Sequence, residues 1–269
     1  MNDDPSRPIG VFDSGVGGLT VLKALQARLP GEDFVYLGDT ARLPYGTKSP
    51  TSVVRYARQA TRRLLDEDVK LLVIACNTAS AVALEALATA TAPLPVVGVV
   101  EPGALAATGA RPEGAHLVLA TEATVRLGAY GRAITALDPA AEVRELPCEL
   151  LVALAEEGWV DGAIAESIVR RYLDSVVFRP DSVILGCTHF PLLADTIRAC
   201  LEPAVSVVDS AVTTADVVAD ALESRGLSRS GTAGDLRFLA TDGAMRFARV
   251  GGRFLGRTLT AADVELVDI

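Results

Sequence analysis

Histidine and cysteine, the residues that most often build metal sites and disulfide scaffolds, are scarce in this chain of 269 residues. The chain has two histidines and four cysteines: His116, His189, Cys76, Cys148, Cys187 and Cys200. No two cysteines form a CxxC pair and the histidines lie far apart, so we expect no Cys/His zinc site. Four cysteines are also too few for a disulfide scaffold in a chain of this size, which favours reduced thiols.

Long apolar runs and an excess of positive charge are missing as well. No apolar run approaches the roughly 18 residues that a membrane-spanning helix needs, and the segment from Met1 to Pro5 lacks the basic and apolar parts of a secretory signal. The 34 acidic residues outnumber the 25 basic ones, which gives a net charge of −9. Binding of nucleic acid as a main function needs a basic surface. We therefore expect a cytoplasmic protein that binds neither membranes nor nucleic acid.

Short apolar segments alternate with amphipathic ones along the chain, and half of its residues are apolar. This alternation predicts an α/β fold in which mostly parallel strands are flanked by helices on both faces. Predicted strands cover residues 9–12, 34–37, 71–75, 117–120, 143–146, 183–185, 205–208 and 238–241. Ser49-Pro50 is a favoured helix start, whereas the stretches 92–95 and 101–103 indicate a break in the pattern. The length allows two medium domains or one large one.

Two of the cysteines follow predicted strands in the same way. Cys76 comes directly after an apolar segment and before Asn77-Thr78, and Cys187 comes after a second apolar segment and before Thr188-His189. Ligands of open parallel sheets bind outside the carboxyl ends of the strands, and a helix N-terminus at that place favours the thiolate. The alternative for each cysteine is a buried small apolar side chain. We prefer that alternative for Cys148 and Cys200, because no polar turn follows them.

Two thiols that face each other across a cleft suit one kind of reaction. One of them, as thiolate, removes a proton from a carbon acid, and the other returns a proton to the opposite face. The stereocentre is then inverted without a cofactor. A protease-like pair of Cys187 and His189 is a competing interpretation, but it leaves Cys76 unexplained.

Four motifs, in this order along the chain, resemble the glutamate racemase family. They are Ile9-Gly10-Val11-Phe12-Asp13-Ser14-Gly15-Val16-Gly17-Gly18-Leu19, Tyr36-Leu37-Gly38-Asp39 with Pro44-Tyr45-Gly46, Ala75-Cys76-Asn77-Thr78-Ala79, and Gly186-Cys187-Thr188-His189-Phe190-Pro191-Leu192. Weaker similarities, such as Val99-Val100-Glu101-Pro102-Gly103 and Val208-Asp209-Ser210-Ala211, extend the resemblance over nearly the whole chain.

The resemblance implies an amino-acid racemase, an isomerase, with two pseudo-symmetric α/β domains and the active site in the cleft between them. It places residues 1–97 and 210–269 in the first domain and residues 98–209 in the second. The enzyme is then expected to interconvert L- and D-glutamate without a cofactor or metal, as a homodimer that supplies D-glutamate for cell-wall peptidoglycan. In this family the cysteine at the position of Cys76 acts on the D-enantiomer, and the one at the position of Cys187 acts on the L-enantiomer.

The resemblance also assigns roles around the two thiols. Asp13, His189 and Glu156 are the expected catalytic residues beside Cys76 and Cys187, and Glu157 is the alternative to Glu156. The expected substrate-binding residues are Asp13, Ser14, Tyr45, Gly46, Asn77, Thr78, Thr121, Thr124, Thr188 and His189.

The residues by themselves leave several of these roles open. Asp13 could simply cap the helix that follows it, and Glu156 could lie on a solvated helix face. The glycine-rich turn after Asp13 lacks the Lys-Ser/Thr ending and the full G-x-G-x-x-G spacing of nucleotide sites. For the whole protein, the alternatives are aspartate racemisation, a one-cysteine decarboxylase and a two-lobed amino-acid-binding protein. The paired cysteines argue against the last two.

Overall fold

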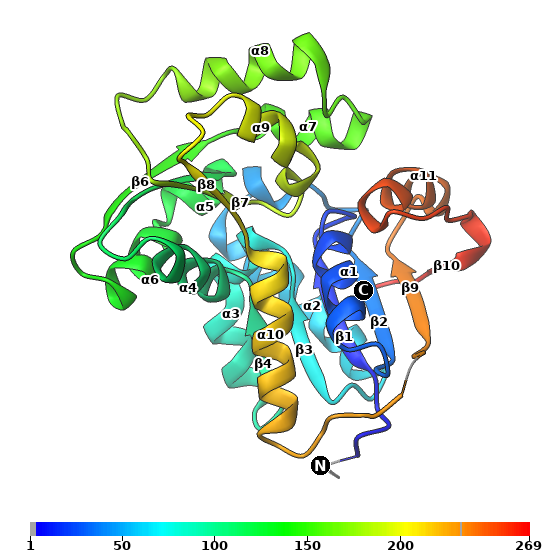
Figure 1. Ribbon diagram of the computed structural model, residues 1–269. Coiled ribbons are helices and arrows are strands. Elements are labelled where there is room, and N and C mark those ends of the chain that lie inside the picture. Colours follow the sequence, from blue (N-terminus) through cyan, green and yellow to red (C-terminus); the bar gives the residue numbers. More distant parts are fainter. Residues whose placement is uncertain (1–3, 232) are drawn as a thin grey trace.

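The computed structural model describes residues 4–231 and 233–269, and the strands of this part of the chain form two sheets with parallel neighbours (Figure 1). The strands are β1 (Ile9–Asp13), β2 (Phe34–Gly38), β3 (Leu71–Ile74), β4 (Val96–Gly98), β5 (Ala115–Ala120), β6 (Glu142–Pro147), β7 (Ser182–Gly186), β8 (Ser206–Asp209), β9 (Leu236–Ala240) and β10 (Val264–Leu266). One sheet has the order β10-β9-β2-β1-β3-β4 and the other the order β6-β5-β7-β8. We refer to each sheet with its helices as the first and the second lobe.

The two sheets share one connectivity. In the first lobe β1 lies between β2 and β3, with β4 outside β3, and in the second lobe β5 lies between β6 and β7, with β8 outside β7. Strands β9 and β10 extend only the first sheet. The predicted α/β class with two related halves is therefore confirmed.

Helices cover both faces of the first sheet. Alternate residues of β1 separate the two cores: Ile9 and Val11 pack with α1 (Leu19–Arg28), and Phe12 packs with α2 (Pro50–Leu65) and α3 (Asn77–Thr91). This alternation is the two-residue period of a strand that is buried on both sides. The cap of α2 forms as predicted, since the side chain of Ser49 accepts a hydrogen bond from the Ser52 N–H and Pro50 follows it.

The second sheet is covered in the same manner. Helices α4 (Val100–Ala110) and α6 (Ala129–Leu137) pack on one face, and α7 (Glu149–Glu157), α8 (Gly162–Leu173) and α9 (Ala194–Ala199) pack on the other. The short helix α5 (Glu122–Arg126) follows β5. Figure 1 shows α7, α8 and α9 at the end of the molecule farthest from the N-terminus.

After β8 the chain returns to the first lobe. Helix α10 (Ser210–Glu223) packs along α1 and α4, and β9 then pairs with β2, with Phe34 opposite Leu236. Helix α11 (Ala244–Leu255) packs on α1, and β10 closes the edge of the sheet. The strand predicted at residues 238–241 thus joins the first sheet, whereas β10 was missed.

Residues 101–103, predicted as part of a break in the pattern, lie in the first turn of α4, the helix between β4 of the first sheet and β5 of the second. Proline is tolerated there, since the first N–H groups of a helix have no partner within the helix. None of the helices in the described part of the chain combines the length and the apolar character that crossing a membrane would require.

Candidate active site

The two strand-end cysteines occupy equivalent places in the two lobes. Cys76 follows β3 and begins α3, and Cys187 follows β7. In each sheet the order in which strands are added reverses beside these strands. This topological switch point lies between β1 and β3 in the first sheet and between β5 and β7 in the second. Parallel sheets bind ligands at such a reversal, outside the carboxyl ends of the strands. Each lobe therefore has one cysteine at the place where a ligand of such a sheet would bind.

The register of the strands sets the neighbours of both thiols. Phe12 of β1 pairs with Ile74 of β3, so Ser14, next to Asp13, leaves the first sheet beside Cys76. Ala120 of β5 pairs with Gly186 of β7, so Thr121 and Cys187 leave the second sheet together.

Around Cys76 the charged neighbour is a carboxylate. The thiol donates to Ser14 Oγ over 3.5 Å, and its sulfur accepts from the Ala79 N–H at 3.4 Å. Asp13 is fully buried; its Oδ2 accepts from the Gly15 N–H at 2.8 Å, and its Oδ1 has no hydrogen-bond partner among the described residues. Burial, and then the charge of Asp13, raise the pKa of Cys76 to about 12. Burial also raises the pKa of Asp13.

Around Cys187 the charged neighbour is a histidine. The sulfur lies 3.8 Å from His189 Nδ1, and His189 Nε2 lies 3.1 Å from Glu156 Oε1. Burial opposes protonation of His189, but its hydrogen bonds to Cys187 and Glu156 outweigh burial and raise its pKa to about 10. Burial would raise the pKa of Glu156, but His189 and Arg246 hold it below the usual value. Glu156, not Glu157, is therefore the carboxylate next to His189.

Side chains from the two lobes meet between the thiols. The hydroxyls of Thr78, Thr121 and Thr124 lie 3.0 to 3.3 Å from one another. Gly17 approaches the second lobe so closely that an added Cβ would lie 2.3 Å from Thr188 Oγ1 and 2.5 Å from His189 Nδ1. Cys187 also lies near enough to Cys76 for its charge to raise the pKa of Cys76.

The segment with Tyr45 and Gly46 closes another side of this region. Tyr45 is buried and its hydroxyl donates to Asp39 Oδ2 at 2.5 Å, so the side chain is turned into the first lobe. A Cβ on Gly46 would lie 2.7 Å from Thr121 Cβ, which places the main chain at residue 46 against the second lobe. Contact of this segment with a ligand would therefore use the main chain.

Several residues near the site were not predicted as members of it. Asp39 also accepts from Arg42 Nε at 2.7 Å and from Thr241 Oγ1 at 2.9 Å. The Tyr130 hydroxyl accepts from Asn77 Nδ2 at 2.7 Å, across the two lobes. Arg246 Nη2 donates to Glu156 Oε2 at 2.7 Å. Asp39 lies in a motif of the resemblance, but no sequence pattern marks Tyr130 or Arg246.

The remaining cysteines and the other histidine lie outside this group. Cys148 follows β6 and is fully buried, and its thiol donates to the Leu146 carbonyl over 3.5 Å. Cys200 is half-buried at the end of α9. His116 lies in β5 with Nδ1 2.7 Å from Ser182 Oγ, at the far end of the strand from the thiols. Within the described ranges, no three His, Cys, Asp or Glu side chains come together in a way that could hold a metal ion.

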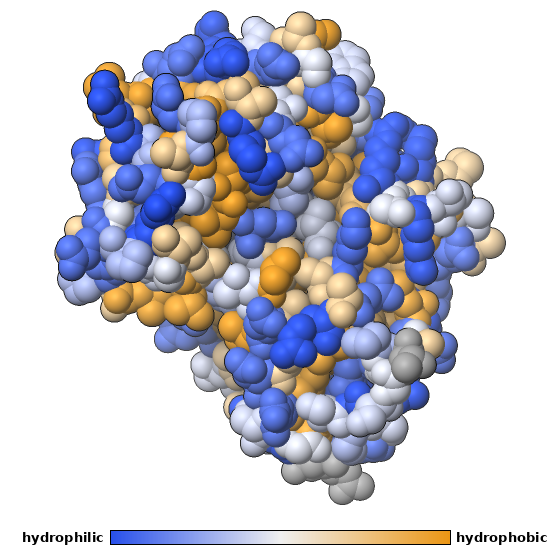
Figure 2. All heavy atoms as spheres, in the orientation of Figure 1, coloured by the Kyte–Doolittle hydropathy of each residue, from blue (hydrophilic) through white to orange (hydrophobic). Residues whose placement is uncertain are grey.

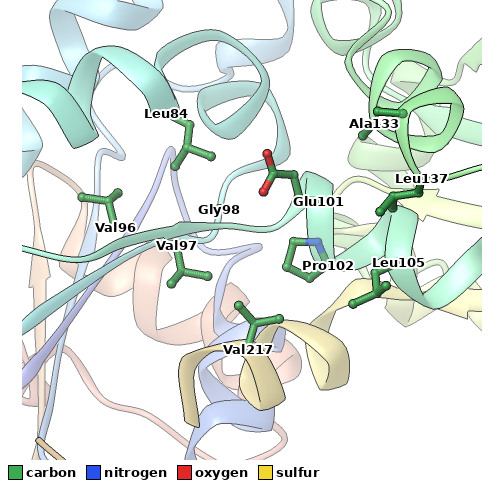
Figure 3. Close-up of a pocket in the computed structure, with 11 residues that line it drawn as sticks. Leu84, Val96, Val97, Gly98, Glu101, Pro102, Leu105, Ala133, Leu137 and Val217 are labelled. Carbon is green, nitrogen blue, oxygen red and sulfur yellow. The ribbon is translucent and has the colours of Figure 1, made fainter. Parts of the chain in front are cut away.

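A separate hollow of about 400 Å³ lies at the seam between the lobes (Figure 3). Its walls come from α3, β4, α4, α6 and α10, and they are apolar apart from Glu101: Leu84, Val96, Val97, Gly98, Pro102, Leu105, Ala133, Ala136, Leu137 and Val217. On the face shown in Figure 2, apolar and polar side chains alternate in small patches over both lobes. The hollow has no cysteine in its walls, so it is separate from the group of residues around the two thiols.

Comparison with known proteins agrees with this arrangement. The model of the Asp/Glu/hydantoin racemase family matches residues 9–218. A glutamate racemase of Geobacter metallireducens is 48% identical over 267 residues, covering 98% of both chains. The crystal structure of a glutamate racemase from Francisella tularensis in complex with D-glutamate aligns with a TM-score of 0.90 at 36% identity, and covers 98% of both chains. That of a Thermus thermophilus glutamate racemase in complex with β-chloro-D-alanine aligns with a TM-score of 0.89 at 43% identity, over 99% of this chain and 98% of that one.

The fold and these similarities define an amino-acid racemase, an enzyme of the isomerase class. The chain belongs to the Asp/Glu/hydantoin racemase family and, within it, to the glutamate racemases. The resemblance inferred from the four motifs is thereby confirmed.

Proposed function

We propose that this enzyme interconverts L-glutamate and D-glutamate, with Cys76 and Cys187 as its two acid/base groups. The observation that carries the proposal is the equivalent position of the two thiols at the strand ends of two related sheets, each with its own charged partner. Glutamate as the substrate is supported by the similarity to glutamate racemases over nearly the full length.

The amino group of the substrate is held by Asp13 and Ser14. Asp13 Oδ1 is buried and has no partner among the described residues, and a buried carboxylate oxygen needs a donor. A substrate ammonium group supplies that donor. It also compensates the charge of Asp13, which is the second contribution to the high pKa of Cys76.

The carboxylates of the substrate are bound by groups at helix starts. The backbone N–H groups at Asn77 and Thr78 open α3, where the helix dipole favours an anion. The hydroxyls of Thr78, Thr121 and Thr124 form a cluster beside them. Asn77, Thr188 and the main chain of Tyr45 and Gly46 complete the contacts.

The reaction moves one proton onto a thiolate and another off a thiol. With L-glutamate, the thiolate of Cys187 takes the α-proton, while the thiol of Cys76 gives its proton to the opposite face of the carbanion. D-glutamate follows the reverse path. His189, kept protonated by Glu156, stabilises the thiolate of Cys187. The carbanion is stabilised by fixed hydrogen-bond donors in a site that excludes water.

This chemistry needs no cofactor, because thiols, hydroxyls and backbone N–H groups supply every step. The product serves the synthesis of peptidoglycan in the cytoplasm, and the enzyme works as a homodimer. The chain forms two domains, residues 1–97 with 210–269 and residues 98–209. The assignment of the strands to the two sheets supports this division. The first boundary, between residues 97 and 98, falls within β4, whose last residue is Gly98.

The test is to incubate the purified protein with L-glutamate and to follow the optical rotation and the amount of each enantiomer. Aspartate and glutamine are run in parallel, and protein alkylated at its thiols is the control. We expect loss of rotation with glutamate only. A constant optical rotation with intact thiols would contradict the proposal and favour another substrate or a binding protein.

A further inference from the structure

Glu156 makes three polar contacts where the two lobes meet. Its Oε1 lies 3.1 Å from His189 Nε2, and its Oε2 accepts from Arg246 Nη2 at 2.7 Å. Its main-chain oxygen accepts from Arg253 Nη1 at 2.8 Å. Both arginines belong to α11, which packs on α1 in the first lobe, whereas Glu156 lies near the end of α7 in the second. Two of the three contacts on Glu156 therefore cross between the lobes.

The two arginines hold different parts of Glu156. Arg253 binds its main chain, and Arg246 binds one oxygen of its carboxylate while His189 takes the other. The side chain of Glu156 is only 14% exposed, whereas that of Arg246 is 59% exposed. Arg246 thus restrains the carboxylate from its solvent side, and without it the carboxylate could rotate away from His189.

One chain of contacts leads from the second thiol to α11: Cys187 contacts His189, His189 contacts Glu156, and Glu156 contacts Arg246. We propose that Arg246 is a positioning residue that holds Glu156 on His189, and thereby supports the thiolate of Cys187 only while α11 and α7 are in contact. The inference rests on the proposed role of Cys187 as an acid/base group. Asp13 and Ser14, the partners of Cys76, lie in the same lobe as Cys76, so contact between the lobes affects the two thiols unequally.

Arg246 and Glu156 line a hollow between the two lobes. This hollow of about 210 Å³ is lined by Val16 and Leu43 of the first lobe as well as by Glu156 of the second. His189 has further neighbours in Asp13, whose charge acts on it, and in the ring of Phe254. Of these groups only Arg246 restrains the carboxylate of Glu156 from the other lobe.

The variant that tests the proposal is Arg246→Gln. Arg249→Gln is the matched control, since Arg249 is exposed in the same helix and forms no ion pair among the described residues. Because a partly exposed ion pair contributes little energy, we expect kcat to fall about fivefold in Arg246→Gln. Arg246→Lys should recover part of this loss, and Arg249→Gln should match the wild type. Far-UV circular dichroism should be unchanged in all three.

The decisive readout is the primary isotope effect with α-deuterated substrate. If Arg246 acts through Cys187, proton removal from L-glutamate becomes more rate-limiting, so the isotope effect rises for L-glutamate. For D-glutamate the proton is removed by Cys76, and the effect falls. A purely structural role would lower the rate in both directions without this divergence, and that result would overturn the proposal.

A second readout does not depend on the substrate. Iodoacetamide alkylation of the wild type and Arg246→Gln at neutral pH is followed for each cysteine by peptide mass spectrometry. We expect Cys187 to react about threefold more slowly in the variant and Cys76 to be unchanged. Equal rates at Cys187 would overturn the proposal. Absence of glutamate turnover in the wild type would instead contradict the proposed function, while the alkylation rates would still test the contact chain.

Discussion

The sulfur of Cys187 lies 3.8 Å from Nδ1 of His189, so the second thiol has a group beside it that can carry a positive charge. The first thiol, Cys76, has the carboxylate of Asp13 as its charged neighbour. Both cysteines are almost equally buried, at 5% and 7% exposure. The two thiols therefore differ in electrostatics and not in access.

This difference predicts the order in which the thiols are alkylated. A thiolate is the reactive form, and a pKa of about 12 leaves Cys76 protonated at neutral pH, whereas the neighbour of Cys187 is His189 and not a carboxylate. We expect iodoacetamide to modify Cys187 first in the absence of substrate, with glutamate protecting both thiols. Peptide mass spectrometry over time measures both rates. Faster modification of Cys76 would contradict the assigned electrostatics.

Replacing either thiol should greatly reduce racemisation. Each thiol serves one face of the substrate, so Cys76→Ala and Cys187→Ala should each lower turnover by about a thousandfold, as expected for loss of a general acid or base. Cys200→Ala is the control, because Cys200 lies outside the site. Cys148→Ala should also keep near wild-type activity. Far-UV circular dichroism checks the fold, and substantial racemisation by either active-site variant would refute the two-thiol assignment.

Activity should survive exhaustive dialysis against a chelator and removal of pyridoxal phosphate. The donors around the two thiols are hydroxyls, backbone N–H groups and single carboxylates, which suit an amino acid better than a metal ion. Glutamate turnover before and after dialysis is the measurement. Loss of activity that returns on adding a metal ion or pyridoxal phosphate would show that the site needs a further component.

His189 should make stability fall with rising pH. Its pKa is raised from 6.5 to about 10 in the folded protein, so its contribution to stability is complete below pH 6.5 and is lost as the pH rises towards 10. The difference in unfolding free energy between the wild type and His189→Asn should therefore shrink across this range in urea titrations. His116→Asn is the control: burial lowers the pKa of His116, so its difference should stay constant above pH 6.5. Parallel curves for His189→Asn and the wild type would contradict the raised pKa.

The strands and the two thiols could be predicted from the sequence because they depend on local patterns. Continuous apolar segments such as residues 71–74 are buried on both faces of a parallel sheet, and a cysteine after such a segment must lie at its carboxyl end. The short edge strands β4 and β10 were missed, since each has only three residues and two of the three in β10 are exposed.

The contacts between the lobes could not be predicted in this way. Tyr130 meets Asn77 and Arg246 meets Glu156 across large separations in the sequence. Many helices carry an arginine or a tyrosine, so these residues by themselves do not indicate a contact. Tyr130 and Arg246 reach Asn77 and Glu156 only because α6 and α11 pack where they do. The choice between Glu156 and Glu157 likewise depends on which face of α7 is turned towards His189.

The position of solvent hydrogen in the product tests the two-thiol mechanism most directly. In D₂O, Cys76 carries a deuteron from the solvent before L-glutamate binds. Cys187 removes the protium of the substrate, and Cys76 delivers deuterium to the opposite face. The D-glutamate product should therefore contain deuterium from its first appearance, whereas the recovered L-glutamate should contain little, because the removed proton stays on a thiol that is shielded in the closed site.

Starting from D-glutamate, the labelling should reverse, with deuterium in the L-glutamate product and little in the recovered D-glutamate, since Cys76 is then the base. A single base that moves between the two faces would return the original proton and give unlabelled product. Mass spectrometry or proton NMR of both enantiomers at low conversion distinguishes the two mechanisms. Early product that is mostly protonated would reject the two-thiol mechanism, whatever the activity of the alanine variants.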